Sequence, residues 1–146
     1  MTLNVRLRIV SPFLGDMPPG RDGVRHFRKL GNCIQLDVAL WLEQLTLAAL
    51  RTGFAADISS IKPPERLLMA SIHIYRREYS KVKVDQFESF RKGTILGLQM
   101  DVEQRPKAPT SDQVNHLMSY VGDHLGLSPW GSKFGFGRFT VLEVTR

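Results

Sequence analysis

Apolar and polar residues alternate along several segments of the chain, and a period of two residues predicts β-strands with one buried face. At the N-terminus, Leu3, Val5, Leu7 and Ile9 are separated by polar residues. Similar patterns predict strands over residues 67–75 and 94–102, and a last strand is expected over residues 138–144. The residues expected to face the core are Leu68, Ala70, Ile72 and Ile74 in the second strand and Leu96, Leu98, Met100 and Val102 in the third.

Two other segments have the spacing of amphipathic helices. The first covers residues 38–51, with Asp37 as a candidate N-cap and Gly53 as the stop. The second follows Thr110 and Gln113, which fit a capping box. Its apolar face consists of Val114, Leu117, Met118, Val121 and Leu125, and Gly126 is the expected residue after its end.

The remaining segments read as loops and hairpins. Residues 11–23 are rich in proline and glycine, and residues 54–65 form a connection in which Pro63 and Pro64 forbid a helix. A hairpin is expected over residues 25–36 with Gly31 and Asn32 at its turn, and a polar hairpin near residues 76–84. The main order is strand, helix, strand, strand, helix, strand. This order predicts a single α+β domain over residues 1–146, with the ferredoxin-like βαββαβ arrangement and extra β-hairpins.

Length and composition agree with one globular domain. The chain has 146 residues, of which 42% are apolar, so a packed core is expected. No apolar run reaches the roughly 18 residues of a membrane helix, and the N-terminus lacks a continuous signal-peptide core. Cys33 is the only cysteine, which excludes an internal disulfide. We therefore expect a cytoplasmic protein with no membrane contact.

The formal charge of +6 favours polyanionic partners. Aromatic residues lie among the basic ones, and this mixture suits single-stranded nucleic acid because cations hold phosphates while aromatic faces stack bases. The alternative is a solvated basic surface with aromatic residues in the core. The candidate nucleic-acid-binding cations in these clusters are Arg25, Arg28, Arg76, Arg77, Arg91 and Lys92.

Residues 131–139, with the sequence GSKFGFGRF, form a glycine-rich segment between the second helix and the last strand. Glycines accept positive φ, and successive backbone N–H groups can form an anion-binding nest. Gly131, Gly135 and Gly137 would shape this loop, while charge and a stacking face come from Lys133, Arg138 and Trp130. The alternative is a tightly packed turn whose glycines only accommodate the chain.

This segment resembles the glycine-rich loop of the RAMP superfamily, the repeat-associated RNA-binding proteins of CRISPR systems. Residues 87–94, with the sequence FESFRKGT, are similar to the family's entry to its third strand. The resemblance implies a ferredoxin-like fold and a loop that touches RNA. It further implies a chain that holds single-stranded RNA within a nucleoprotein complex, or a standalone or phage-encoded relative. Many members carry two ferredoxin-like units, whereas this chain has room for one.

Catalytic chemistry has fewer candidates. The glycine pattern is not a dinucleotide fingerprint, because a helix precedes it and a strand follows it. The four histidines are dispersed, so neither a metal nor another cofactor is expected. The alternative of a metal-independent endoribonuclease would use His26 or His73 as general base or acid on a ribose 2′-hydroxyl. A further alternative is a phage-encoded interaction protein that docks on a CRISPR or other nucleoprotein complex.

Overall fold

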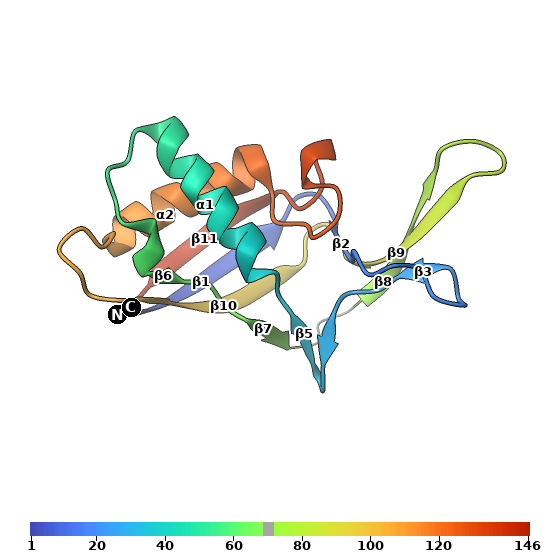
Figure 1. The fold of residues 1–146 in the computed structure, drawn as a ribbon, viewed down its shortest axis with the longest axis horizontal. Coiled ribbons are helices and arrows are strands. Elements are labelled where there is room, and N and C mark those ends of the chain that lie inside the picture. The colour runs from blue at the N-terminus through green and yellow to red at the C-terminus, as the bar shows by residue number, and fades with distance from the viewer. Residues whose placement is uncertain (69–71) are drawn as a thin grey trace.

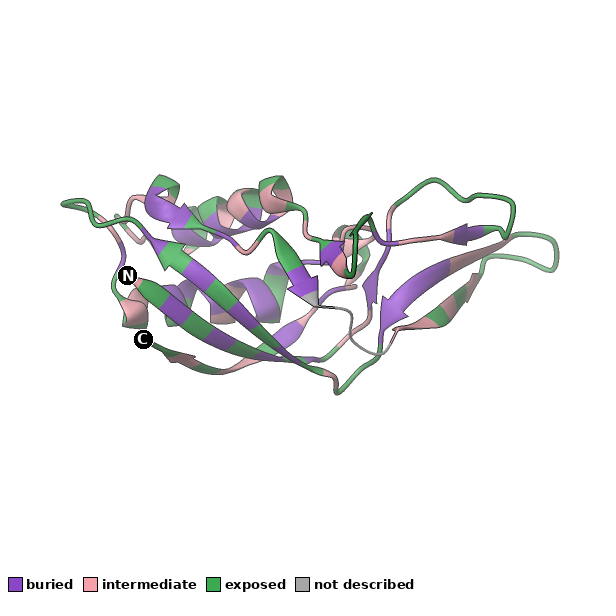
Figure 2. Ribbon diagram, turned by 90° about the horizontal axis from the view of Figure 1, so that it is seen from below, coloured by how far each residue is buried: buried purple, intermediate pink, exposed green. Residues whose placement is uncertain are grey.

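A computed structural model describes residues 1–68 and 72–146. Its main sheet is antiparallel and has the strand order β11-β1-β10-β6. The strands are β1 (Thr2–Ile9), β6 (Ile61–Lys62), β10 (Ile95–Val102) and β11 (Phe139–Thr145). Buried and exposed residues alternate strictly along β1 and β10, as their sequence pattern predicts (Figure 2).

Helices α1 (Val38–Thr52) and α2 (Ser111–Tyr120) cover one face of this sheet (Figure 1). The apolar face of β1 packs with Leu45 of α1 and with Leu117 of α2 in one hydrophobic core. The opposite face of the sheet carries polar residues such as Arg6 and Gln99, which are exposed. Burial of the apolar faces against each other is the main stabilising contribution of this arrangement.

Both predicted helix starts and the first predicted stop are confirmed. The side chain of Asp37 accepts a hydrogen bond from the backbone N–H of Leu40 at 3.0 Å, and Gly53 ends α1 with a φ of +73°. Thr110 and Gln113 form the expected capping box at the start of α2. These contacts satisfy backbone groups that the helix ends would otherwise leave unpaired.

The second helical segment ends before Gly126, as predicted, but its last turn is not α-helical. A π-helical turn, η2 (Val121–Leu125), replaces the last α-helical turn and closes with a hydrogen bond of 2.7 Å from the N–H of Gly126 to the carbonyl of Val121. Gly122 lies against β11, where an added Cβ would come within 2.3 Å of the carbonyl oxygen of Phe139. The wider turn keeps Val121 and Leu125 buried while this close approach is maintained.

A second sheet forms an arm that extends away from the main sheet, on the side opposite the two termini (Figure 1). The arm consists of β2 (Phe13–Leu14), β3 (Val24–Arg25), β8 (Ile72–Glu78) and β9 (Val84–Phe90). The central strand β9 pairs antiparallel with β8 and β2 and parallel with β3. The polar hairpin expected near residues 76–84 is confirmed as the outer part of the β8–β9 hairpin.

A small third sheet has the order β4-β5-β7. Its strands β4 (Lys29–Leu30) and β5 (Cys33–Gln35) confirm the hairpin predicted around Gly31 and Asn32. Strand β7 (Arg66–Leu68) pairs with β5.

The prediction of one strand over residues 67–75 is wrong. Leu68 belongs to β7 of the third sheet, and β8 of the arm begins at Ile72. The expected core residue Ile74 lies on β8 of the arm and is 48% exposed. Met69, Ala70 and Ser71 lie outside the described residues. The strand that pairs with β10 is instead β6, which lies in the segment predicted to be a connection.

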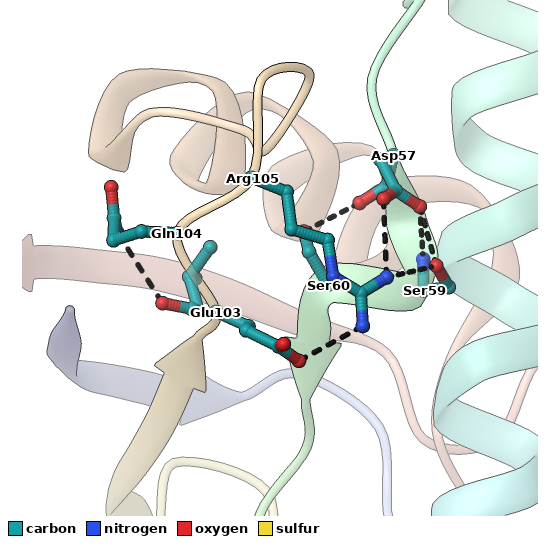
Figure 3. Close-up of polar contacts among 7 residues, drawn as sticks. Asp57, Ser59, Ser60, Glu103, Gln104 and Arg105 are labelled. Carbon is teal, nitrogen blue, oxygen red and sulfur yellow. Dashed lines mark hydrogen bonds and ion pairs between the residues drawn. The ribbon is translucent and has the colours of Figure 1, made fainter.

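A polar network fixes the connection before β6 to the segment that follows β10 (Figure 3). Asp57 caps the short 3-10 turn η1 (Ile58–Ser60). The guanidinium of Arg105 lies 3.3 Å from Asp57 and 2.9 Å from Glu103, and it donates to Oγ of Ser59 at 3.0 Å. A hydrogen bond from Ser59 and the nearby guanidinium lower the pKa of Asp57. The network joins two loops at the end of the sheet that lies away from the arm.

The described residues thus form a mixed α/β fold with helices on one face of the main sheet. None of its helices has the length and apolar character required to cross a bilayer.

Candidate nucleic-acid interface

The glycine-rich loop (residues 131–138) connects η2 to β11 and contains the 3-10 turn η3 (Ser132–Phe134). Gly135 and Gly137 have φ values of +90° and +77°, which confirms the positive φ expected for them. A Cβ on Gly137 would lie 2.1 Å from the backbone nitrogen of Ser128, whereas a Cβ on Gly135 would meet no atom within 4 Å. Gly137 is therefore required for packing of the loop, and Gly135 leaves open space beside it.

Two serines, which the sequence analysis did not identify, hold this loop in place. Oγ of Ser11 donates to the carbonyl of Gly135 at 2.7 Å and accepts from the N–H of Arg138 at 2.9 Å. Oγ of Ser128 accepts from the N–H of Leu14 at 2.8 Å and donates to the carbonyl of Trp130. Gly135 and Arg138 lie more than 120 residues from Ser11, and Leu14 lies 114 residues from Ser128, so no local signal marks these contacts.

The loop packs against the arm through an aromatic cluster. Its members are Tyr75, Phe87, Trp130, Phe134 and Phe136. The ring centroids of Trp130 and Phe87 are 4.6 Å apart, and those of Tyr75 and Phe136 are 5.6 Å apart. The cluster therefore joins residues of β8 and β9 to residues of the loop.

Arg77 of β8 is the cation associated with this cluster. Its guanidinium carbon lies 5.3 Å from the ring centroid of Trp130 and 5.5 Å from that of Phe134, within the range of cation–π attraction. Arg76 points to the opposite face of β8, because side chains alternate along a strand, and it pairs with Glu78 at 3.3 Å. The two arginines that were predicted together thus lie on different surfaces.

Four predicted cations belong to two segments that meet at the carboxyl end of β1. The carbonyl of Arg138 accepts from the N–H of Val10 at 2.9 Å, and the N–H of Gly93 donates to the carbonyl of Ile9 at 2.6 Å. These bonds bring the loop and the turn between β9 and β10 to the same end of the strand. The cations concerned are Arg91, Lys92, Lys133 and Arg138.

The other predicted cations have different surroundings. The guanidinium of Arg138 donates to the carbonyl of Asp123 at 2.6 Å, so part of its role is structural. Arg25 on β3 lies opposite Phe87 in the register of the arm, and therefore on the face of the aromatic cluster. Arg28 is exposed and lies 3.7 Å from Asp16.

His26, a candidate catalytic residue, lies between two carboxylates. Its Nε2 is 2.6 Å from Asp22 and its Nδ1 is 2.9 Å from Glu88. The hydrogen bond with Asp22 raises the pKa of His26, burial acts in the opposite direction, and Glu88 adds to the rise. Both ring nitrogens are thus engaged in ion pairs, which suits a structural role better than that of a free general base. We call this ion-pair network of Asp22, His26, Lys29 and Glu88 the brace.

Glu88 is the centre of this brace, and the sequence analysis missed it. Its side chain is 10% exposed and also accepts from Nζ of Lys29 at 2.9 Å and from the N–H of Phe27 at 3.0 Å. Burial raises the pKa of Glu88, but the hydrogen bonds from Lys29, Phe27 and His26 outweigh burial and lower it. The signal available in the sequence was a single carboxylate between Phe87 and Phe90.

His73, the second catalytic candidate, lies on β8. Its Nδ1 is 3.2 Å from the backbone carbonyl of Ser89, its partner across the strand pair. Glu88, which contacts His26, is adjacent to Ser89 on β9. Because side chains of adjacent strand residues point to opposite faces, His73 and His26 lie on opposite faces of the arm. The catalytic roles of both histidines stay predictions.

A groove of about 630 Å³ runs between α1 and the glycine-rich loop. Basic residues on its walls are Arg51, Lys133 and Arg138, together with His124, and Glu43 is its acidic residue. The apolar lining includes Leu40, Leu47 and Phe134. The groove therefore combines positive charge with an aromatic ring.

Comparison with known proteins indicates similarity in fold. No protein-family model and no curated protein sequence matches the chain. A chain of a solved "Type IV-B CRISPR Complex" is 12% identical with a TM-score of 0.57, and the match covers 99% of this chain and 90% of that one. A chain of the "Type III-B Cmr-beta bound to cognate target RNA" is 7% identical with a TM-score of 0.54, and the match covers 99% of this chain and 59% of that one. The chain thus shares its fold with chains of two CRISPR effector complexes.

Proposed function

We propose that this chain is a single-domain, RAMP-like protein that binds single-stranded RNA within a CRISPR-type nucleoprotein complex. The glycine-rich loop and the basic and aromatic residues around it form the RNA-binding surface. The protein acts as a binding module in this proposal, and the ion-paired state of His26 gives no support to a catalytic role.

The strand order supports the ferredoxin-like part of the proposal. In the main sheet, β1 is followed by α1 and β10 is followed by α2, and the order β11-β1-β10-β6 inserts β10 between β1 and β6. This order supports the split βαβ arrangement that we propose for the main sheet. The likeness to chains of two CRISPR complexes, one of which is bound to cognate target RNA, supports the same interpretation.

The observation that carries the proposal is the packing of the glycine-rich loop against the arm. It places Arg77 against the rings of Trp130 and Phe134, while Lys133 and Phe134 remain exposed at the loop's surface. Single-stranded RNA presents phosphates to cations and unpaired bases to aromatic faces. Both kinds of contact are available over this loop.

The experiment is a binding titration with fluorescein-labelled single-stranded RNA. The double variant Lys133→Ala/Arg138→Ala removes two cations from the surface. Loss of a charged contact is expected to weaken binding about tenfold per cation. Because Arg138 also bonds to Asp123, the single variant Lys133→Ala is measured beside it.

The matched control is Lys107→Ala/Arg146→Ala, which removes the same charge from exposed positions at the other end of β1. We expect the control to bind as the parent does. Equal affinities of the parent and the loop variant, in proteins with equal melting temperatures, would refute the proposal. Equal weakening in both double variants would indicate attraction by net charge alone and would also refute it.

A further inference from the structure

Phe134 is an unusual residue at the tip of the glycine-rich loop. Its side chain is 68% exposed, although the other members of the aromatic cluster are buried or half-buried. A large exposed aromatic ring beside cations is characteristic of a surface that contacts a partner. The exposed ring is therefore suited to a ligand with a flat apolar face.

The backbone beneath Phe134 is held rigidly. Its N–H donates to the carbonyl of Gly131 at 2.8 Å, and the N–H of Gly135 donates to the carbonyl of Ser132 at 3.2 Å. Oγ of Ser132 donates to the carbonyl of Ser128 at 2.8 Å. The ring is thus held on a preorganised turn, so the loop would lose little conformational entropy when a ligand binds to the ring.

The surroundings of Phe134 are cationic and aromatic. The Trp130 ring lies 5.8 Å from it at an interplanar angle of 36°, and the guanidinium carbon of Arg77 lies 5.5 Å from its centroid. Lys133 precedes it and is exposed. The groove that it borders contains Arg51, Lys133 and Arg138 against Glu43 as its one acidic residue among those described. This excess of positive charge complements a phosphate backbone.

Trp130 has less free surface than Phe134. Its ring is surrounded by Phe87 at 4.6 Å, Phe136 at 5.9 Å, Phe134 and the guanidinium of Arg77. These contacts occupy the ring and fix the loop against the arm. A base that stacks on this surface therefore has Phe134 as its accessible platform.

We propose that Phe134 is a stacking platform for one unpaired nucleobase, with Lys133 and Arg51 at the adjoining phosphates. This inference rests on the proposed RNA-binding function. A single strand fits because its bases are free to leave their neighbours, whereas a duplex hides the base faces in its stack. An aliphatic side chain of a partner protein is the competing occupant, and its packing would need an apolar surface but no π-face.

The test uses two variants of one exposed position and one change in the RNA. Phe134→Leu keeps an apolar side chain without a π-face, and Phe134→Trp keeps the face. We expect Phe134→Leu to weaken binding of a labelled single-stranded RNA by about 5- to 150-fold and Phe134→Trp to bind within about threefold of the parent. An RNA of the same length without bases is expected to bind the parent and Phe134→Leu equally.

The outcomes separate this inference from the function on which it rests. If Phe134→Leu binds RNA as tightly as the parent while Lys133→Ala binds weakly, the stacking platform is refuted and the RNA-binding function stands. If the parent binds baseless RNA as tightly as normal RNA, the platform is refuted without any variant. If the parent binds neither RNA, the proposed function fails and the platform fails with it.

Discussion

The guanidinium carbon of Arg77 lies 5.3 Å from the centroid of the Trp130 ring, and this contact joins the arm to the residue that immediately precedes the glycine-rich loop. Arg77 belongs to β8, whereas Trp130 follows the second helix. The contact therefore fixes the orientation of the loop relative to the β8–β9 hairpin of the arm. The proposed RNA-binding surface depends on this orientation.

Replacing Arg77 is expected to loosen the loop. Arg77→Ala should lower the free energy of unfolding by about 0.5–2 kcal/mol, since it removes a cation from several aromatic rings. The matched control is Arg76→Ala on the opposite face of β8, where an exposed ion pair contributes at most about 1 kcal/mol. Urea unfolding followed by tryptophan fluorescence measures both. A larger effect of Arg76→Ala would contradict the proposed role of Arg77.

The two loop glycines are expected to differ in their tolerance of a side chain. Gly135→Ala should cost about 1–2 kcal/mol, since only its φ of +90° opposes a Cβ. Gly137→Ala should cost about 3 kcal/mol or more, because its Cβ would also meet the backbone of Ser128. Thermal unfolding of both variants measures the difference. Equal costs would show that the loop is not packed as described.

The brace around His26 predicts a pH dependence of stability. The pKa of His26 is raised, so its contribution is complete below the ordinary value of 6.5 and is lost as the pH rises through the folded pKa. The pKa of Glu88 is lowered, so its contribution is present above the ordinary value of 4.5 and is lost as the pH falls through the folded pKa. Stability should therefore be greatest between these two values.

The variant His26→Gln isolates the alkaline limb of this profile. The difference in unfolding free energy between the parent and His26→Gln should be larger at about pH 5.5 than at about pH 8.5, because the charged imidazolium makes the stronger contacts with Asp22 and Glu88. Urea unfolding at the two pH values measures it. A difference that does not change with pH would mean that His26 is not charged in the fold.

The core prediction concerns Leu117 on α2, whose side chain is fully buried. Leu117→Ala should lower the free energy of unfolding by about 2–5 kcal/mol through lost burial and a residual cavity. Leu50→Ala on α1 removes the same atoms from a side chain that is 76% exposed, and it should change stability by less than about 0.5 kcal/mol. Similar effects of the two substitutions would contradict the packing of the helices.

The elements that could be predicted are those whose periodicity is long and whose ends carry caps. The alternation in β1 and β10, the cap at Asp37 and the capping box at Thr110 are all local signals. The prediction of one strand over residues 67–75 was wrong because its outcome depends on long-range pairing and not on a local signal. Apolar and polar residues alternate along this segment, but pairing partners distant in sequence divide it between two sheets, so that Leu67 is buried and Ile74 is exposed.

The candidate site shows the same limit. Glycines, cations and aromatic residues in residues 130–138 are visible in the sequence, so the loop and its positive φ values were predictable. The contact between Arg77 and Trp130, and the burial of Glu88, depend on long-range packing of the arm. The sequence therefore predicted that Trp130 stacks on a base, whereas in the structure Phe134 is the exposed ring.

The most direct test of the RNA-binding claim is the salt dependence of affinity for single-stranded RNA. If the four cations of the two segments that meet at the end of β1 contact phosphates, the slope of log K against log salt concentration should be about −3. Lys133→Ala/Arg138→Ala should flatten it by about 1.4, whereas Lys107→Ala/Arg146→Ala should leave it unchanged. A slope near zero, or a slope that the loop variant does not alter, would contradict the account.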